Sequence, residues 1–210
     1  VAVLSWQNPG FIQRDDEPVL CVSYEDAAAY ASWLASTTGR SYRVPSSVEF
    51  EYASRAGSDA AWHWGNNSED ACLYANVGDT TLKRRFPERQ DFNCNDGFEN
   101  TSRVKHFKPN AYGLYDMVGN AWEWCADWYS PNTYRSTARS TLVADPVGPA
   151  AGTTRVIRGG SYLCHASYCN RYRVAARSHN TPNSSSGNCG FRTAAVREAT
   201  PEPTDDGVTN

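Results

Sequence analysis

The stretch GGSYLCHASYCNRYRVAARSHNTPNSSSGNCGFR (residues 159–192) places Cys164 and Cys169 among serines, asparagines and arginines. Three strand-like pieces overlap or follow it, at residues 154–163, 170–176 and 190–196. Short pieces of this kind, joined by polar segments, predict a fold built from short strands and loops.

The composition of the whole chain agrees with this interpretation. Its 210 residues include seven Trp, twelve Tyr and fifteen Gly but only one Met, and long helix-forming runs are few. We therefore expect a core of aromatic rings held by loops, with little regular secondary structure. We see no internal repeat. The chain is expected to form one irregular α+β domain at residues 1–197, followed by a disordered tail rich in Pro, Thr and Asp at 198–210.

Charge and hydropathy exclude two classes of partner. The formal net charge is −3, and no basic run is present that could follow a phosphate backbone, which argues against nucleic acid. No apolar run is long enough to span a bilayer, and no secretory signal opens the sequence. We therefore expect neither a nucleic-acid partner nor a membrane segment.

Residues 23–39 predict the first helix. Ser23 is the expected N-cap, Asp26 completes a capping box three residues later, and Gly39 ends the helix. The apolar face at helical spacing consists of Ala27, Tyr30, Ala31 and Leu34.

A second helix is expected within residues 45–57, with Ser46 and Glu49 as its capping box and Gly57 as its end. Residues 62–102 then show no period of 2 or 3.6 and are expected to be a long loop. Long loops inside compact domains are usually functional or held in place by another feature.

Two segments offer oxygen atoms that would suit a hard cation. The first provides side chains and backbone carbonyls at Asn76, Val77, Asp96 and Phe98. The second provides them at Asp116, Gly119, Ala121 and Glu123. Oxygen-only ligation suits calcium. The same residue types also dominate ordinary turns, so the spacing alone fits solvated turns as well.

Three interpretations of Cys164 and Cys169 remain open from spacing alone. A disulfide would close a short loop and contribute little chain entropy. Inert burial is common for unpaired cysteine. A pair of thiolates would select a soft metal, and Cu(I) accepts low coordination where zinc requires four ligands.

Several longer motifs show a family resemblance. Residues 155–192 closely resemble the C-terminal active-site region of the formylglycine-generating enzymes, the sulfatase-modifying factors. NAYGLYDMVGNAWEW (110–124) is similar to their central signature, and residues 42–57 are more loosely similar to their helix motif. The helix and central signatures also occur in non-catalytic members of the superfamily. The Cys-His-x-Ser-Tyr-Cys run at 164–169 is far more specific to the enzymes.

The resemblance implies a fold, an activity and a partner. The fold is an irregular α+β domain of the C-type lectin-like type. The activity is oxidation of one cysteine in a Cys-x-Pro-x-Arg segment of an unfolded sulfatase to Cα-formylglycine, with molecular oxygen as co-substrate. The partner is therefore a sulfatase polypeptide or peptide, and we expect the chain to act as a monomer.

The resemblance also assigns residues at the copper centre. Cys164 and Cys169 match the Cu(I)-binding pair, to which the substrate thiolate would add a third sulfur. Ser161 and Trp122 match residues that line the oxygen pocket, and Tyr168 lies beside the metal in the same motif. In this scheme the metal performs the difficult step, while the protein provides position and a guarded pocket.

Two other sets of residues carry over. Ser185 and Asn188 match residues that contact the substrate peptide. The resemblance also favours structural calcium at both oxygen-rich segments, although the family often has Asn at the position of Asp116. The expected cofactors are therefore Cu(I) and Ca²⁺, with O₂ as co-substrate.

Some features depart from the family pattern. Val174 and Thr193 stand where secreted vertebrate members have structural cysteines, which favours a cytoplasmic, bacterial-type protein. The family's Gly-Gly-x-Phe-x-Met-Gly segment and an acidic region for the substrate arginine are not found, so we expect the N-terminal family segment to be missing. Of the other cysteines, Cys72 and Cys94 could pair, and three are expected to be solitary core residues: Cys21, Cys125 and Cys189.

A rival class is a non-catalytic binding protein. The same lectin-like scaffold presents variable ligand-binding surfaces in proteins diversified by retroelements, and their C-terminal segments share RVIRGGS and GFR with this chain. Such a protein would have no need for the pair Cys164 and Cys169. A third hypothesis is an oxidase of the superfamily that acts on another substrate.

Overall fold

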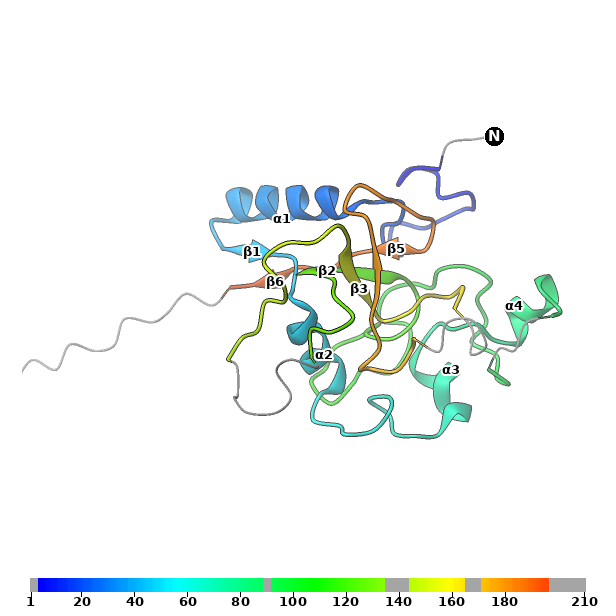
Figure 1. Ribbon diagram of the computed structural model, residues 1–210. Coiled ribbons are helices and arrows are strands. Elements are labelled where there is room, and N and C mark those ends of the chain that lie inside the picture. The colour runs from blue at the N-terminus through cyan, green and yellow to red at the C-terminus, as the bar shows by residue number, and fades with distance from the viewer. Residues whose placement is uncertain (1–3, 89–91, 135–143, 165–170, 197–210) are drawn as a thin grey trace, which may run out of the picture.

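The computed structural model in Figure 1 describes residues 4–88, 92–134, 144–164 and 171–196. The expected tail at 198–210, together with Tyr168 and Cys169, lies outside the described residues. No helix within the described ranges combines the length and apolar character needed to cross a bilayer.

Helix α1 (Tyr24–Thr38) has the predicted termini. Ser23 is the N-cap and forms a complete capping box with Asp26, and Gly39 closes the helix in the left-handed conformation. The predicted apolar face is wrong in one place. Ala27 and Ala31 are buried, but Tyr30 is 45% exposed and packs against Trp33 and Phe191 at the surface.

Helix α2 (Ser47–Arg55) also has its predicted capping box, between Ser46 and Glu49. Its C-cap is Ala56 in the left-handed conformation, one residue before the predicted Gly57. The two helices lie on opposite sides of the central strands in Figure 1.

The central sheet has four strands in the order β4-β3-β2-β5. These are β2 (Trp122–Trp128), β3 (Arg155–Arg158), β4 (Ser178–Asn180) and β5 (Cys189–Gly190). The β2–β3 and β3–β4 pairs are antiparallel, whereas β5 runs parallel to β2. A separate two-stranded sheet pairs β1 (Tyr42–Arg43) with β6 (Ala194–Ala195). The sheet places Trp122 and Cys189 side by side, which brings the central and C-terminal motifs together.

The core lies around β2 and contains polar as well as apolar groups. Trp124 is fully buried, and its Nε1 donates to the carbonyl of Val22 at 3.0 Å. Arg158 is also fully buried, where it pairs with Glu51 and donates to Ser47 Oγ. A buried cation persists only when it is paired and hydrogen-bonded in this way.

Three expectations about local structure are wrong. The segment 62–102 is not entirely loop, because it contains η1 (Ser68–Asp70), α3 (Ala71–Tyr74) and α4 (Thr80–Arg85). Residues 171–176 of the expected strand are not in a strand, and β4 begins only at Ser178. The expected strand at 190–196 is divided between β5 and β6.

Candidate active site and cation sites

A turn immediately after β3 holds Ser161 and Cys164. Gly159 and Gly160 both have positive φ, which directs the chain out of the strand. The Cys164 N–H donates to the Ser161 carbonyl at 2.9 Å, and Ser161 Oγ lies 3.8 Å from Cys164 Sγ. Ser161 is fully buried and Cys164 is 4% exposed. The turn therefore keeps a thiol and a hydroxyl adjacent and shielded from bulk water.

Asn188 and Trp122 complete the surroundings of this turn. The Asn188 side-chain amide donates to Ser161 Oγ at 3.0 Å. The Trp122 backbone N–H donates to the Asn188 carbonyl at 2.8 Å. The Trp122 side chain packs in the same core cluster as Cys164. The structure thus brings together four predicted site residues from three segments: Trp122, Ser161, Cys164 and Asn188.

The other predicted members of this site are less closely placed. Ser185 is exposed, three residues before Asn188 on the same loop. Cys169 and Tyr168 lie outside the described residues.

Tyr172 contacts the same turn and was missed by the sequence reasoning. Its hydroxyl lies 2.7 Å from the carbonyl of Ser161 and 2.6 Å from that of Cys164, and donates to these two oxygens. It also accepts a hydrogen bond of 2.8 Å from the N–H of Gly78. No spacing rule identifies this contact, because the two carbonyls belong to residues 11 and 8 positions before Tyr172 in a segment without helical or strand periodicity.

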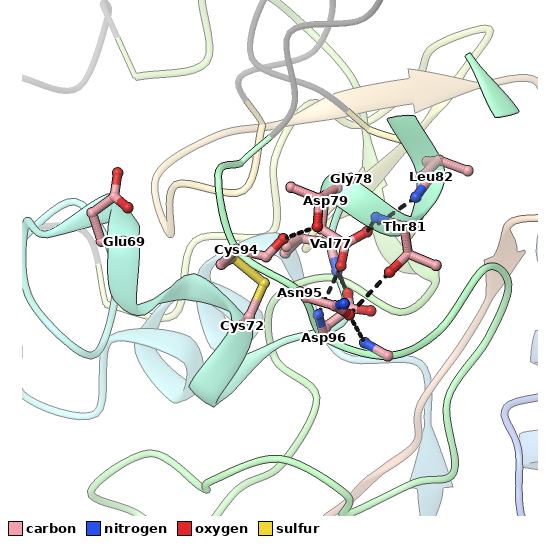
Figure 2. The surroundings of a disulfide bond; sticks show 12 residues. Glu69, Cys72, Val77, Gly78, Asp79, Thr81, Leu82, Cys94, Asn95 and Asp96 are labelled. Carbon is pink, nitrogen blue, oxygen red and sulfur yellow. Dashed lines mark hydrogen bonds between the residues drawn. A yellow bond between two sulfur atoms is a disulfide. The ribbon is translucent and has the colours of Figure 1, made fainter. Parts of the chain in front are cut away.

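A disulfide joins Cys72 of α3 to Cys94, as the sequence analysis allowed, with a Cα–Cα distance of 6.0 Å. Figure 2 shows this bond beside the carboxylates of Asp79 and Asp96. Oxygen atoms of both carboxylates and the sulfur of Cys72 lie within 4.8 Å of one another. The disulfide therefore ties together the two chain segments that contain the first candidate calcium site.

Backbone amides donate several hydrogen bonds to these two carboxylates. Asp96 accepts from the N–H groups of Val77 and Phe98, each at 2.8 Å. Asp79 caps α4 by accepting from Thr81 and Leu82, and it also accepts from the N–H of Asp96 at 2.7 Å. In the described part of the chain neither carboxylate forms an ion pair.

The negative charge of Asp79 and Asp96 is not balanced by a cationic side chain among the described residues. Burial raises the pKa of Asp96 to about 7, and the nearby charge of Asp79 adds to the effect against the backbone hydrogen bonds. Asn76 is fully buried, and its Oδ1 has no hydrogen-bond partner among the described atoms. An unpaired buried acceptor next to poorly stabilised carboxylates is what a bound calcium ion would satisfy.

The second candidate calcium site already contains a cation of the protein. Both carboxylate oxygens of Glu123 accept from the guanidinium of Arg192, which also donates to the Asp116 carbonyl at 3.1 Å. Asp116 Oδ2 accepts from the N–H of Lys105 at 2.8 Å, and burial raises the pKa of Asp116. These groups line a cavity of about 500 Å³.

The two candidate calcium sites are in direct backbone contact. Gly119 has φ +75°, and a Cβ atom placed there would lie 2.1 Å from the Asn76 carbonyl oxygen. The N–H of Asn120 donates to that same oxygen at 2.8 Å. Only glycine permits this approach, which explains its place in the central signature.

The remaining thiols fit the prediction of solitary core residues. Cys21, Cys125 and Cys189 are buried and outside any disulfide. Burial raises the pKa of all three, most strongly for Cys125 in β2 and Cys189 in β5. A thiol held protonated in this way is a poor nucleophile and a poor metal ligand.

Comparisons with known proteins agree with this geometry. The family model of the sulfatase-modifying factor enzyme 1-like domain matches residues 4–197. The formylglycine-generating enzyme of Streptomyces coelicolor is 48% identical over 183 residues, which are 86% of this chain and 53% of that protein. The chain spans about half the length of the curated relatives it matches.

Two solved structures share the fold. PvdO from Pseudomonas aeruginosa superposes with a TM-score of 0.70 at 30% identity, over 88% of this chain and 64% of that one. Treponema denticola variable protein 1 superposes with a TM-score of 0.66 at 25% identity, over 87% and 72%. The α+β, C-type lectin-like fold expected from the sequence is thereby confirmed. With its family model covering nearly the whole chain, this protein belongs to the sulfatase-modifying factor family, the family of the formylglycine-generating enzymes.

Proposed function

We propose that this chain is a copper-dependent oxidase that converts the cysteine of a Cys-x-Pro-x-Arg segment in a sulfatase to Cα-formylglycine. The observation that carries the proposal is the hydrogen-bonded arrangement of buried Cys164 and Ser161 with Asn188, in which Cys164 packs in the same core cluster as Trp122. Sequence similarity to a protein named formylglycine-generating enzyme supports the same chemistry.

The residues present fit Cu(I). Cys164 offers a soft, buried sulfur ligand, and the described polar groups that interact around it, Ser161 and Asn188, are neutral. Cys164 and Cys169 would hold the ion together with the substrate thiolate. When bound, copper supplies the one-electron chemistry that O₂ requires.

The side chains of the protein have simpler tasks in this proposal. Asn188 donates to Ser161 Oγ, which fixes the hydroxyl beside Cys164. Trp122 and the burial of the turn would restrict water, and Ser185 and Asn188 would contact the substrate peptide. Tyr168 would act beside the metal, as the resemblance of its motif implies. The substrate side chain loses two electrons to become a thioaldehyde, and hydrolysis of its C–S bond by water gives the aldehyde and releases hydrogen sulfide. Full reduction of O₂ to water takes four electrons. A thiol reductant would supply the other two.

We further propose structural calcium at the two oxygen-rich sites. The first would use Asn76, Val77, Asp96 and Phe98, and is supported by the unpaired Asn76 Oδ1 and the unbalanced charge of Asp96. The second would use Asp116, Gly119, Ala121 and Glu123, where Arg192 competes for Glu123. We expect the first to bind more tightly.

A peptide conversion assay tests the proposed activity. The purified chain, loaded with Cu(I), is incubated in air with a thiol reductant and a Cys-x-Pro-x-Arg peptide, and the product is read by mass spectrometry. A loss of about 18 Da from the peptide, absent in Cys164→Ala, in Cys169→Ala and under copper chelation, is the expected result. If copper binds at the two thiols and no peptide is converted, the substrate assignment is wrong.

A second candidate function is ligand binding without catalysis. The structural similarity to Treponema denticola variable protein 1 favours it, because that similarity covers most of both chains. Failure of the chain to bind Cu(I) would support this function over the oxidase, and Cys164 would then be a structural residue.

We also propose a monomeric protein, and a cytoplasmic location on the sequence resemblance alone. The Cys72–Cys94 disulfide opposes that location, because disulfides persist mainly in oxidising compartments, so the state of these two cysteines in cells tests it directly. Alkylation of freshly lysed cells before reduction would find both as thiols in the cytoplasm. Finding them disulfide-bonded would assign the protein to an oxidising compartment instead.

A further inference from the structure

We propose that Tyr172 is a positioning residue that fixes the Cys164 turn and couples it to the disulfide-linked loop at residues 76–80. This inference rests on the proposed function, since it assigns Tyr172 a task toward the thiol that would bind copper. It does not require Tyr172 to touch the metal or the substrate.

The geometry places one hydroxyl at the centre of three backbone groups. Tyr172 is 2% exposed. Its hydroxyl proton is shared by the carbonyls of Ser161 and Cys164, which begin and end the turn, at 2.7 and 2.6 Å. Its oxygen accepts from the N–H of Gly78 at 2.8 Å. Backbone polar groups buried without partners are costly, so the hydroxyl stabilises this one conformation of the turn.

The ring of Tyr172 is held as firmly as its hydroxyl. A Cβ atom at Gly160 would lie 2.6 Å from Tyr172 Cδ1, so the ring packs directly on the backbone at the start of the turn. Phe92 contacts the ring from another direction, with centroids 5.5 Å apart. The Gly160 backbone and the Phe92 ring both hold the Tyr172 ring in place. If the Cys164 turn moved, the Tyr172 hydroxyl could therefore not move with it and its hydrogen bonds to the turn would break.

Gly78 connects the turn to the disulfide region. It lies between Val77, whose N–H binds Asp96, and Asp79, which caps α4. The Gly78 carbonyl accepts from the N–H of Phe92 at 2.8 Å, and the N–H of Thr80 donates to the Cys94 carbonyl at 3.1 Å. The Cys72–Cys94 bond therefore fixes the loop that fixes Tyr172, and Tyr172 fixes the Cys164 turn.

The Tyr172→Phe variant tests the proposal, because it keeps the ring and removes only the hydroxyl. Two quantities are measured under anaerobic conditions: Cu(I) affinity, by competition with a chromophoric chelator, and the rate of iodoacetamide alkylation at Cys164 in the metal-free native chain, by peptide mass spectrometry. We expect Cu(I) affinity to fall about tenfold and alkylation to accelerate about threefold or more.

Tyr162→Phe is the matched control. Tyr162 lies in the same turn and is also buried, but its hydroxyl donates to the Gly187 carbonyl at 3.2 Å and to neither Ser161 nor Cys164. Tyr162→Phe should lose about as much global stability as Tyr172→Phe. It should change neither the Cu(I) affinity nor the alkylation rate of Cys164 by more than about twofold. If folded Tyr172→Phe matches the wild-type chain in both quantities, or if Tyr162→Phe reproduces its effects, the positioning role is wrong.

The coupling to the loop is tested by a double-mutant cycle. The Cys72→Ser/Cys94→Ser pair should weaken Cu(I) binding about threefold in the wild-type background and have little further effect on Tyr172→Phe. Additive effects would overturn the coupling. If the wild-type chain binds no Cu(I), the proposed copper chemistry fails, and the alkylation rates in the same cycle still decide the role of Tyr172.

Discussion

The two oxygen-rich regions of this molecule contain the same types of ligand and differ in what balances their charge. Around Asp96, two buried carboxylates are held by backbone amides, and the amide oxygen of Asn76 has no partner among the described atoms. Around Glu123, the guanidinium of Arg192 binds both carboxylate oxygens. Among the described residues no cationic side chain pairs with the carboxylates of the first region, whereas the second contains an arginine that can serve as the cation.

This difference shows why a ligand motif alone does not determine metal affinity. A carboxylate already paired with arginine must exchange that partner for calcium, and only the difference between the two interactions favours binding. Asp96 has no arginine to exchange, so calcium there has only to displace the proton that the raised pKa of this carboxyl favours. We therefore expect calcium to stabilise the first region more strongly, and the following changes test that expectation.

The largest effect is expected from Arg192→Gln. Its pair with Glu123 is mostly buried, with side-chain exposures of 28% and 9%. Removing one partner should lower the free energy of unfolding in calcium-free buffer by about 4 kcal/mol. Added calcium should then restore part of the loss, because Glu123 becomes available. Chemical denaturation with and without calcium measures both effects.

Arg43→Gln is the control for this variant. Arg43 pairs with Glu49 at the surface, where the side chains are 46% and 43% exposed, and its loss should cost less than about 1 kcal/mol without any calcium response. A calcium response in wild type equal to that in Arg192→Gln would contradict the idea that arginine occupies the second region.

Removal of the disulfide should have the next largest effect. The bond closes a loop with a sequence separation of 22, so Cys72→Ser/Cys94→Ser should lose about 3 kcal/mol of stability. The same variant should weaken calcium binding at the first region, since the disulfide joins the two segments that form it. Calorimetric titration measures the calcium affinity of both chains. An unchanged affinity would show that the disulfide does not support calcium binding at the first region.

Paired Asp→Asn substitutions compare the two regions directly. Calcium at a hundred times its dissociation constant stabilises a folded chain by about 2.7 kcal/mol. Asp96→Asn should abolish most of this calcium-dependent stabilisation, and Asp116→Asn should leave most of it. Asn is tolerated at position 116, where φ is +56°, so the control should fold normally. The reverse ranking would show that the second region is the stronger calcium site.

The sequence was most informative where the chemistry is local. Ser23 with Asp26 and Ser46 with Glu49 are contacts between residues three apart, and both capping boxes form as predicted. Strand β2 was missed because its side chains are buried on both faces of the sheet, so WEWCADW lacks the alternation that identifies a half-buried strand.

The sites were less predictable because they depend on distant contacts. The family motif identified Ser161, Cys164 and Asn188, but the contact of Tyr172 with the turn is a tertiary hydrogen bond to backbone carbonyls that no residue pattern marks. Asp79 was not considered because residues 62–102 were expected to be loop, where Asp is an ordinary turn residue. In the structure it is the N-cap of α4, and its place beside Asp96 depends on the approach of two segments that the Cys72–Cys94 bond joins.

The smallest effect concerns the aromatic cluster next to the disulfide. His63 contacts Trp64 and Tyr74, the last residue of α3, and burial lowers the pKa of His63 to about 4. The unfolded chain therefore binds a proton on His63 at a higher pH than the folded chain does. The stability that the folded chain gains from keeping His63 neutral is fully present above the unfolded pKa of about 6.5. This stability is lost as the pH falls toward 4, the pKa in the folded chain. Denaturation of the wild-type chain and His63→Gln across this range should show an additional loss of about 2 kcal/mol in the wild type, a value reduced for the partial exposure of the ring.

The same protonation should also affect the first oxygen-rich region, because α3 contains Cys72 as well as Tyr74. Acid should therefore weaken calcium binding in that region through His63 and leave calcium binding in the Glu123 region unaffected by this histidine. Identical pH profiles for the two chains would show that His63 does not support α3.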